Sequence, residues 1–294
     1  MIIAAPIQGF TDRFWRKAHC SVIGGIAEYV TPFMCLEQGE FRKKDLADLP
    51  LDEPLTVPQI LVKTPEELSR FADFLSEKSF SKIDLNFGCP YEPLTRRGYG
   101  AGMLRNPIVL EDVLRTTADF PEIAFSVKMR LPEVPEILSV LNNFSLRHIV
   151  LHSRTAEMQY SGSPDWEAFE RFSSESVNKV IYNGDILTVE DIWKTDVMIG
   201  RGLLRDPLLG CKAQGKTLPA DILVRFHERY QANCMELEQP LQKLKTMWEY
   251  FLPDAPKNLR KKILKSRTLE EYSDYVQLLF EILEQQEERT ENVP

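Results

Sequence analysis

The 294-residue sequence lacks the long apolar run of a membrane protein, because no stretch approaches the ~20 apolar residues that a spanning helix requires. It also lacks the composition of a disordered chain, since 43% of its residues are hydrophobic and 27% are charged. The segment Met1–Pro6 contains no basic residue and only a short apolar stretch, so we expect no secretory signal. These absences favour a globular protein of the cytoplasm.

The patterns of disulfide frameworks and zinc sites are absent as well. The five cysteines, at positions 20, 35, 89, 211 and 234, are widely spaced and include no Cys-x-x-Cys pair. The four histidines form no His-Glu-x-x-His pattern. We therefore expect reduced thiols and no metal site.

Positive charge is in deficit overall, because 36 Lys and Arg residues face 44 Asp and Glu residues, a net charge of −8. This balance argues against nonspecific adhesion to nucleic acid. Basic residues are nevertheless concentrated in 257–267, where six of eleven residues are Lys or Arg and none is acidic. Such a run is usually a solvated helix face, and the alternative is a phosphate-binding rim formed together with Lys243, Lys245 and the Arg96-Arg97 loop.

Short apolar runs alternate with helical patterns over the first 215 residues, which predicts an α/β fold. Most of the runs are as apolar as strands buried on both faces should be. The eight predicted strands are Ile2–Ala5, Ile26–Val30, Val57–Leu61, Ile83–Leu85, Ala124–Lys128, His148–Leu151, Val180–Tyr182 and Val197–Ile199. The helical patterns between them include Thr64–Glu77, Ile108–Asp119, Pro132–Asn142 and Trp166–Phe172, and Thr188 also resembles a helix start. Eight such units favour a (β/α)8 TIM barrel over an open doubly wound sheet, because polar residues follow several different strands.

The pattern changes after about residue 215, where no strand is expected. Four helical segments follow: Leu218–Glu236, Pro240–Phe251, Leu259–Leu264 and Leu269–Gln286. We therefore predict a catalytic barrel domain over 1–215 and a C-terminal all-helical domain over 216–294.

Residues able to carry chemistry follow the predicted strands. Asn183-Gly184-Asp185 and Gly200-Arg201-Gly202 end the last two strands, where barrels commonly bind phosphate, although each is also an ordinary turn sequence. Lys128 ends another strand and could stabilise negative charge on a bound ring, while Gln59 offers an amide to a heterocycle. Cys89, between Gly88 and Pro90, is a candidate nucleophile or proton donor rather than a buried apolar residue.

The segment Ile83–Pro90, Ile-Asp-Leu-Asn-Phe-Gly-Cys-Pro, with Gly100-Ala101 ten residues after its end, resembles the signature of the tRNA-dihydrouridine synthases. Further segments of similar sequence occur in the order of that family: 5–12, 127–130, 152–155, 183–186 and 198–202. The resemblance covers roughly residues 2 to 210. Gly-Cys-Pro alone would be weak, because dihydroorotate dehydrogenases carry something similar.

The resemblance implies an FMN barrel followed by a helical domain, with NADPH, or more broadly NAD(P)H, as reductant and tRNA as partner. Cys89 would be the proton donor. The cofactor would be bound by Pro6, Ile7, Gln8, Gln59, Lys128, His152, Arg154, Asn183, Gly184, Asp185, Gly200 and Arg201. The tRNA would be bound by Asn86 and Arg130 at the uracil, and by Arg96, Arg97, Arg260, Lys261, Lys262 and Lys265. We expect the protein to act as a monomer.

The sequence departs from the family pattern at Ile7-Gln8, where a Met and a small or acidic residue are usual, and at Gly102. The stretch Tyr29–Phe33 and the long C-terminal helices resemble the bacterial C-type subgroup, which acts on uridine 16 of the D-loop. Two alternatives are a small-molecule reductase of the dihydroorotate-dehydrogenase type and an RNA-binding barrel that has lost its chemistry. The basic C-terminal segment disfavours the first, and the retention of Lys128 and Cys89 disfavours the second.

Overall fold

The structure is a computed structural model that describes residues 1–159, 161–192 and 195–291. The chain forms two compact units. The first contains Met1–Arg13, Ile26–Ile186 and Glu190–Gly200; the second contains Phe14–Gly25, Leu187–Val189 and the chain from Arg201 onward. The domain boundary predicted at residue 215 stays a prediction, because each compact unit contains several segments of the chain and neither ends at that residue.

The first unit is built on a parallel sheet with the strand order β5-β2-β1-β11-β10-β9-β8-β7-β6. Its strands are β1 (Ile2–Ala4), β2 (Glu28–Val30), β5 (Thr56–Val57), β6 (Gln59–Ile60), β7 (Lys82–Phe87), β8 (Ala124–Arg130), β9 (Ile149–His152), β10 (Val180–Asn183) and β11 (Val197–Ile199). The end strands β5 and β6 are separated only by Pro58, so the sheet returns on itself and closes into a barrel. Proline cannot donate to the ladder and divides one strand in two. When β5 and β6 are counted as one strand, the barrel has eight strands, and the predicted (β/α)8 barrel is confirmed.

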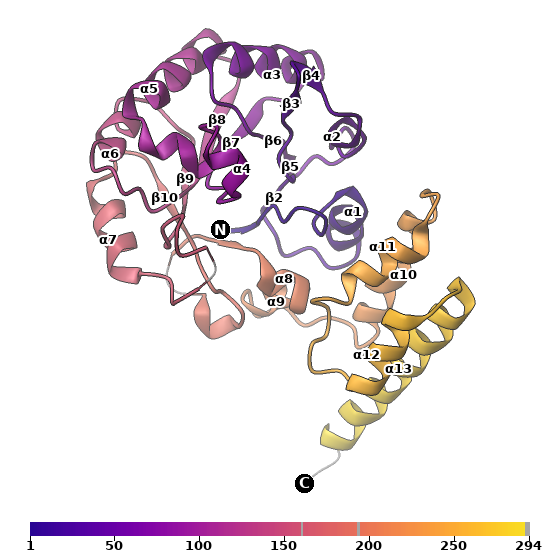
Figure 1. Ribbon diagram of the computed structural model, residues 1–294. Helices are drawn as coiled ribbons and strands as arrows, with labels where there is room; N and C mark the ends of the chain where they lie inside the picture. Colours follow the sequence, from indigo (N-terminus) through magenta and orange to yellow (C-terminus); the bar gives the residue numbers. More distant parts are fainter. Residues whose placement is uncertain (160, 193–194, 292–294) are drawn as a thin grey trace. The chain divides into compact units, whose positions relative to one another are not determined.

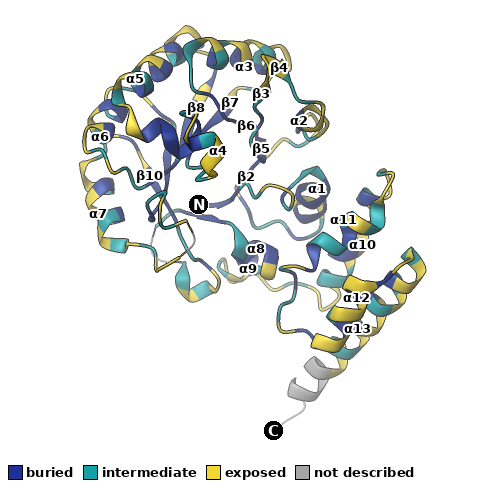
Figure 2. Ribbon diagram, in the orientation of Figure 1, coloured by how far each residue is buried: buried dark blue, intermediate teal, exposed yellow. Residues whose placement is uncertain are grey.

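Helices surround these strands, as Figure 1 shows. They are α2 (Lys43–Ala47), α3 (Pro65–Glu77), α4 (Glu92–Thr95), α5 (Pro107–Arg115), α6 (Glu136–Leu141) and α7 (Trp166–Glu175), with short 3₁₀ helices at Gly100–Arg105, Thr116–Asp119 and Val189–Asp191. The start of α3 is set locally, because the Thr64 hydroxyl accepts a 3.3 Å hydrogen bond from the Glu67 amide and Pro65 occupies the first turn. Figure 2 shows the strands buried and the outward helix faces exposed.

The interior of the barrel has an apolar side. Side chains alternate along each strand, so every second residue points inward. A buried cluster collects Ile3, Ala5, Val30, Val150, Ile181 and Met198 from five strands and the end of β1. On β6, β7 and β8, the buried polar residues Gln59, Asp84 and Ser126 form the base of the site described below.

Three local predictions differ from the structure. The helix predicted over Pro132–Asn142 begins only at Glu136, because Pro135 occupies its N-cap position. The helix start at Thr188 yields only the 3₁₀ turn, and residues 193 and 194 lie outside the described residues. A hairpin of β3 (Leu36–Glu37) and β4 (Glu40–Phe41) was not predicted, because its strands are two residues long and show no apolar alternation.

The second unit is helical. Its helices are α1 (Arg13–Val22), whose first residue belongs to the barrel unit, α8 (Arg201–Arg205), α9 (Leu209–Lys212), α10 (Ile222–Cys234), α11 (Pro240–Met247), α12 (Lys257–Lys265) and α13 (Leu269–Glu291). Its core contains a hydrogen-bonded aromatic chain: Trp248 Nε1 donates to the Tyr272 hydroxyl at 2.8 Å, and that hydroxyl lies 2.7 Å from His227 Nε2. All three side chains are buried. The four helices predicted in this region are confirmed.

None of the helices in the described part of the chain is both long enough and apolar enough to cross a membrane.

Candidate functional site

The site begins with a row of buried polar side chains inside the barrel. The Asp84 carboxylate on β7 accepts hydrogen bonds from Gln59 Nε2 at 2.7 Å and from the Ser126 hydroxyl at 2.6 Å. The Gln59 Oε1 atom in turn accepts from Asn86 Nδ2 at 2.7 Å. Burial raises the pKa of Asp84, and the hydrogen bonds from Gln59 and Ser126 oppose that rise. The row therefore fixes the orientation of Asn86 from within the barrel.

Asn86 holds the loop that carries Cys89. Its Oδ1 atom accepts from the backbone amides of Gly88 at 3.1 Å and Cys89 at 2.9 Å, directly beyond the end of β7. A carbonyl that receives two successive amides fixes the direction in which the chain leaves the strand. Asn86 therefore positions Cys89, and its predicted contact with uracil stays a prediction.

The Cys89 loop, residues 88–102, closes on itself. The Ala101 amide donates to the Cys89 carbonyl at 3.0 Å. Gly100 lies in the left-handed region, at φ +55°, and a Cβ added there would stand 2.7 Å from the Cys89 carbonyl oxygen. A Cβ at Gly102 would stand 2.3 Å from the Thr95 carbonyl oxygen. The small residues after the Gly-Cys-Pro motif are therefore required by close backbone packing against the thiol-bearing segment.

The thiol of Cys89 is half-buried and protonated at neutral pH. Burial raises its pKa, outweighing the opposing effects of the Tyr91 amide and of the positive charges of Lys128 and Arg130. The pKa of Lys128 is lowered to about 8, chiefly by desolvation and secondarily by Arg130, while Asp84 and Cys89 act in the opposite direction. The mouth of the barrel therefore places a cation beside a neutral thiol, which can donate a proton.

Arg130 connects two loops of the mouth. Its Nε atom donates to the Gly88 carbonyl at 3.1 Å, and its Nη1 atom donates to the carbonyls of Thr155 at 2.9 Å and Gln159 at 2.7 Å. The side chain is 2% exposed. These contacts assign Arg130 a positioning role at the Cys89 loop, and its predicted contact with uracil stays a prediction.

His152 and Arg154 are brought together at the end of β9. Arg154 is buried, bonds both carboxylate oxygens of Asp185, and donates to the Gly162 carbonyl. Its Nη1 atom also lies 3.2 Å from His152 Nε2, which must accept because arginine only donates. The predicted cofactor residues Arg154 and Asp185 are thus paired with each other.

The two glycine turns lie at the ends of adjacent strands. Asn183 on β10 pairs in register with Met198 on β11, and its Nδ2 atom donates to the Met198 carbonyl at 2.8 Å. A Cβ at Gly184 would stand 2.4 Å from the Tyr182 hydroxyl, and one at Gly200 would stand 3.3 Å from Ile7 Cδ1. A side chain at Gly184 would force the Tyr182 ring to move, whereas one at Gly200 would need only a small shift of the Ile7 side chain. Glycines at the ends of two adjacent strands leave backbone amides that a phosphate group could approach closely.

The remaining predicted residues of the cofactor site lie on other elements of the chain. Pro6, Ile7 and Gln8 follow β1, where the Ile7 amide donates to the Thr11 hydroxyl at 2.8 Å and Gln8 is exposed. Gln59 is fully buried beneath the mouth. Arg201 begins α8 in the second unit.

The predicted basic residues differ in what they contact. Arg96 and Arg97 are exposed on the Cys89 loop, and Arg96 pairs with Glu92. In the second unit, Lys261, Lys262 and Lys265 are exposed on α12. Arg260 instead donates to the carbonyls of Pro253, at 2.9 Å, and Trp248, so its guanidinium supports the helical unit.

Sequence reasoning missed Asp84 and Ser126. The available signal was a carboxylate within an apolar strand, directly before the Asn86 motif. No group of three His, Cys, Asp or Glu side chains suited to a metal ion occurs within the described ranges.

The fold and this centre define a class: a (β/α)8-barrel protein with a protonated thiol held at the carboxyl ends of its strands, where barrel active sites lie. The chain matches the family model "Dihydrouridine synthase (Dus)" over residues 2–293. It therefore belongs to the dihydrouridine synthase family, a family of oxidoreductases.

Several curated proteins are similar to this chain. It is 36% identical over 238 residues to the tRNA-dihydrouridine(16) synthase of Cupriavidus necator, covering 73% of each chain. It is 30% identical over 239 residues to the protein of the same description from Ralstonia nicotianae, again over 73% of each. It is 26% identical to the tRNA-dihydrouridine synthase B of Escherichia coli, over 73% of this chain and 68% of that one.

Among solved structures, the chain is similar to a variant of NCR from Zymomonas mobilis. The TM-score is 0.50 at 12% identity, covering 78% of this chain and 92% of the other. A likeness at this identity bears on the fold alone, and it agrees with the barrel.

Proposed function

We propose that this protein is an FMN-dependent tRNA-dihydrouridine synthase, which saturates the C5=C6 bond of a uridine in tRNA. The target we propose is uridine 16 of the D-loop. Family membership and two relatives described as tRNA-dihydrouridine(16) synthases, at 36% and 30% identity, support this assignment. An enzyme with this substrate would work in the cytoplasm, as a monomer in our proposal.

The observation that carries the proposal is the state of Cys89. Saturation of the C5=C6 bond adds a hydride at C6 and a proton at C5, so the enzyme needs a group that still holds its proton at neutral pH. The thiol of Cys89 meets this need because burial raises its pKa. Lys128, half-buried beside it, would stabilise the negative charge that develops on the uracil carbonyl before protonation.

The residues of the mouth fit an FMN group. Lys128 and Gln59 would meet the ring system, with His152 beside them, while Asn183 and the backbone amides of Gly184 and Gly200 would hold the phosphate at the ends of β10 and β11. FMN, when bound and reduced by NADPH, supplies the hydride for C6. The protein residues position the base, protect it from water and deliver the proton.

The uracil must leave the stacked RNA to reach Cys89. The base is extruded into the mouth, as in other enzymes that modify a nucleobase. Arg130 and Asn86 would act there by holding the loops that border the extruded base, because each bonds the backbone beside Cys89.

A cysteine substitution tests the proposal. Cys89→Ala should form dihydrouridine in a tRNA transcript at less than about one hundredth of the wild-type rate, because loss of a general acid typically costs about 10²–10⁴-fold, while keeping the flavin absorbance spectrum. Cys20→Ala removes an exposed thiol of the other unit and should leave the rate unchanged. Full activity of Cys89→Ala would contradict the proton-donor role.

The target position needs a separate measurement. Mapping dihydrouridine in tRNA from cells that lack the gene should show its loss at position 16 alone. Loss at another position would keep the activity and reject the assignment to uridine 16.

A further inference from the structure

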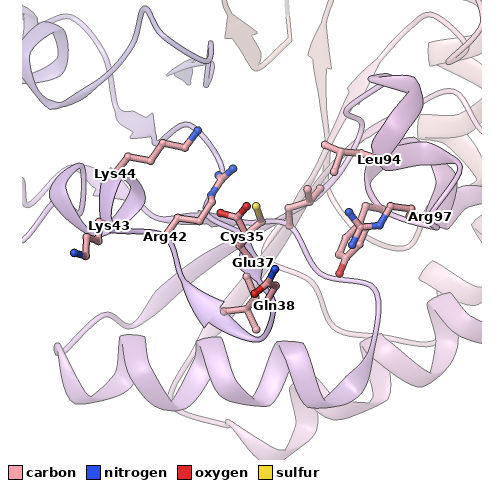
Figure 3. Close-up of a pocket in the computed structure, with 11 residues that line it drawn as sticks. Cys35, Glu37, Gln38, Arg42, Lys43, Lys44, Leu94 and Arg97 are labelled. Carbon is pink, nitrogen blue, oxygen red and sulfur yellow. The ribbon is translucent and has the colours of Figure 1, made fainter.

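A cavity of about 650 Å³ in the barrel unit is lined in part by residues of the Cys89 loop. We call it the hairpin pocket, and Figure 3 shows α2 on one side of Cys35 and the Cys89 loop on the other. The residues that line it include Cys35, Glu37, Arg42, Lys44, Arg97 and Tyr99. The cavity falls within the range of about 300–1,000 Å³ typical of small-ligand sites.

The wall on one side is built by the β3–β4 hairpin and α2. Gln38 and Gly39 have φ values of 52° and 83°, the two positive angles that a two-residue type I′ hairpin requires. Beyond the hairpin, Arg42 bonds both carboxylate oxygens of buried Asp45, and Asp45 also accepts from the Cys35 amide at 3.1 Å. This wall is therefore fixed by its own hydrogen bonds.

The opposite wall belongs to the same loop as Cys89. The Tyr99 hydroxyl donates to Glu67 at 2.6 Å, which fixes the ring, and the Arg97 guanidinium lies 5.5 Å from the ring centroid. Gly100, the next residue, packs directly against Cys89. The hairpin pocket and the thiol therefore share one loop.

The charge of the pocket is positive. Arg42 is neutralised by Asp45, whereas no carboxylate within the described ranges forms an ion pair with Lys44 or Arg97. Glu37 is the one acidic residue that lines the described pocket, and its side chain is exposed to solvent. Unpaired cations on opposite walls of a cavity are suited to a phosphate group, and the guanidinium over Tyr99 offers a planar face to a base.

We propose that the hairpin pocket binds the phosphate and base of a nucleotide flanking the target uridine in the RNA substrate. This inference rests on the proposed function. An RNA strand that delivers a base to Cys89 must continue past the Cys89 loop, and the pocket opens on that loop. The pocket would thus set which neighbouring nucleotide is accepted, separately from the chemistry at the thiol.

The test uses Lys44→Ala and Arg97→Ala in the full-length holoenzyme, with Lys78→Ala as the matched control. Lys78 is an exposed lysine at the C-terminal end of α3, away from the pocket lining. The probes are an unmodified tRNA transcript and NADPH. We measure kcat and KM for each, and the dependence of the transcript Kd on salt concentration.

The pocket variants should raise the tRNA KM several-fold, leave kcat and the NADPH KM near wild type, and reduce the slope of log Kd against log salt by about one per cation removed. Lys78→Ala should match wild type. If the wild type is active and both variants keep its tRNA KM and its salt slope, the pocket proposal is overturned and the proposed function stands. A selective rise in the NADPH KM would also overturn it, by assigning the pocket to the reductant. A wild type that forms no dihydrouridine would instead reject the proposed function, and this inference with it.

Discussion

At the scale of single residues, the position of Cys89 depends on neighbours that have no reactive group. The side-chain carbonyl of Asn86 accepts from the backbone amides of Gly88 and Cys89, and Gly100 has no side chain that would collide with Cys89. The reactive thiol is therefore held by backbone geometry.

A pair of glycines allows this to be tested. Gly98 and Gly100 both have positive φ, at +84° and +55°, but a Cβ at Gly98 would meet no atom within 4 Å, whereas one at Gly100 would collide with Cys89. Gly98→Ala should cost about 1–2 kcal/mol of unfolding free energy and leave kcat intact. Gly100→Ala should also lower kcat by up to ~100-fold in folded protein, because it displaces the thiol. Thermal unfolding and single-turnover rates measure the two effects, and equal kcat values for both variants would contradict this account.

At the scale of secondary-structure elements, the eight barrel strands and the four C-terminal helices α10 to α13 could be predicted from apolar runs, caps and proline positions, whereas α1, α8 and α9 were not predicted. The β3–β4 hairpin could not, because its turn is Gln-Gly and its strands carry no apolar pattern. The roles of Arg130 and Arg260 could not either. Both guanidiniums bond backbone carbonyls of distant segments, and sequence alone does not show which carbonyls a fold leaves unpaired.

The buried chain in the second unit predicts a pH effect. The Tyr272 hydroxyl accepts from Trp248 Nε1 and lies 2.7 Å from His227 Nε2, so the imidazole is enclosed among hydrogen-bonded aromatic side chains and away from water. Burial lowers the pKa of His227 from 6.5 to about 4. As pH falls, the imidazole of the unfolded chain therefore binds a proton before that of the folded chain does. The resulting contribution to the free energy of unfolding is fully present above pH 6.5. It is lost as pH falls toward 4, by roughly 3 kcal/mol for one such group.

Thermal unfolding between pH 7.5 and 5 measures this effect. His227→Gln, which has no titrating group, should be less stable than wild type at pH 7.5 and should lose less stability on acidification. His19 and His148 are also buried with pKa values of about 4, so some pH dependence should remain in the variant. An unchanged pH dependence would show that His227 is not protonated on unfolding.

At the scale of the whole molecule, a net charge of −8 coexists with exposed lysines on α12. We expect tRNA binding to weaken with salt despite that net charge. The reason is that each lysine that contacts a phosphate releases a counterion from it. Arg260 is unsuited to this test, since its removal would leave two carbonyls of the helical unit without their donor.

The test variant is Lys261→Gln/Lys262→Gln/Lys265→Gln. Its control, Lys78→Gln/Arg115→Gln/Arg171→Gln, removes the same number of exposed cations from the barrel unit. The triple variant should weaken binding of the tRNA transcript and reduce its salt slope by about three if each lysine contacts a phosphate. The control should bind as wild type does. Unchanged binding by the triple variant would show that α12 does not dock the RNA.

The row from Asp84 through Gln59 to Asn86 has a consequence for how such a protein can change over time. The Cys89 thiol is anchored to the inside of the barrel, whereas the cations that we propose as RNA contacts stand on α2, the outer Cys89 loop and α12. Substitutions on those outer segments can alter which RNA is accepted without disturbing the anchor. Chemistry and substrate choice are thus separable by mutation, which lets selection redirect the enzyme to a new site while its reaction is preserved.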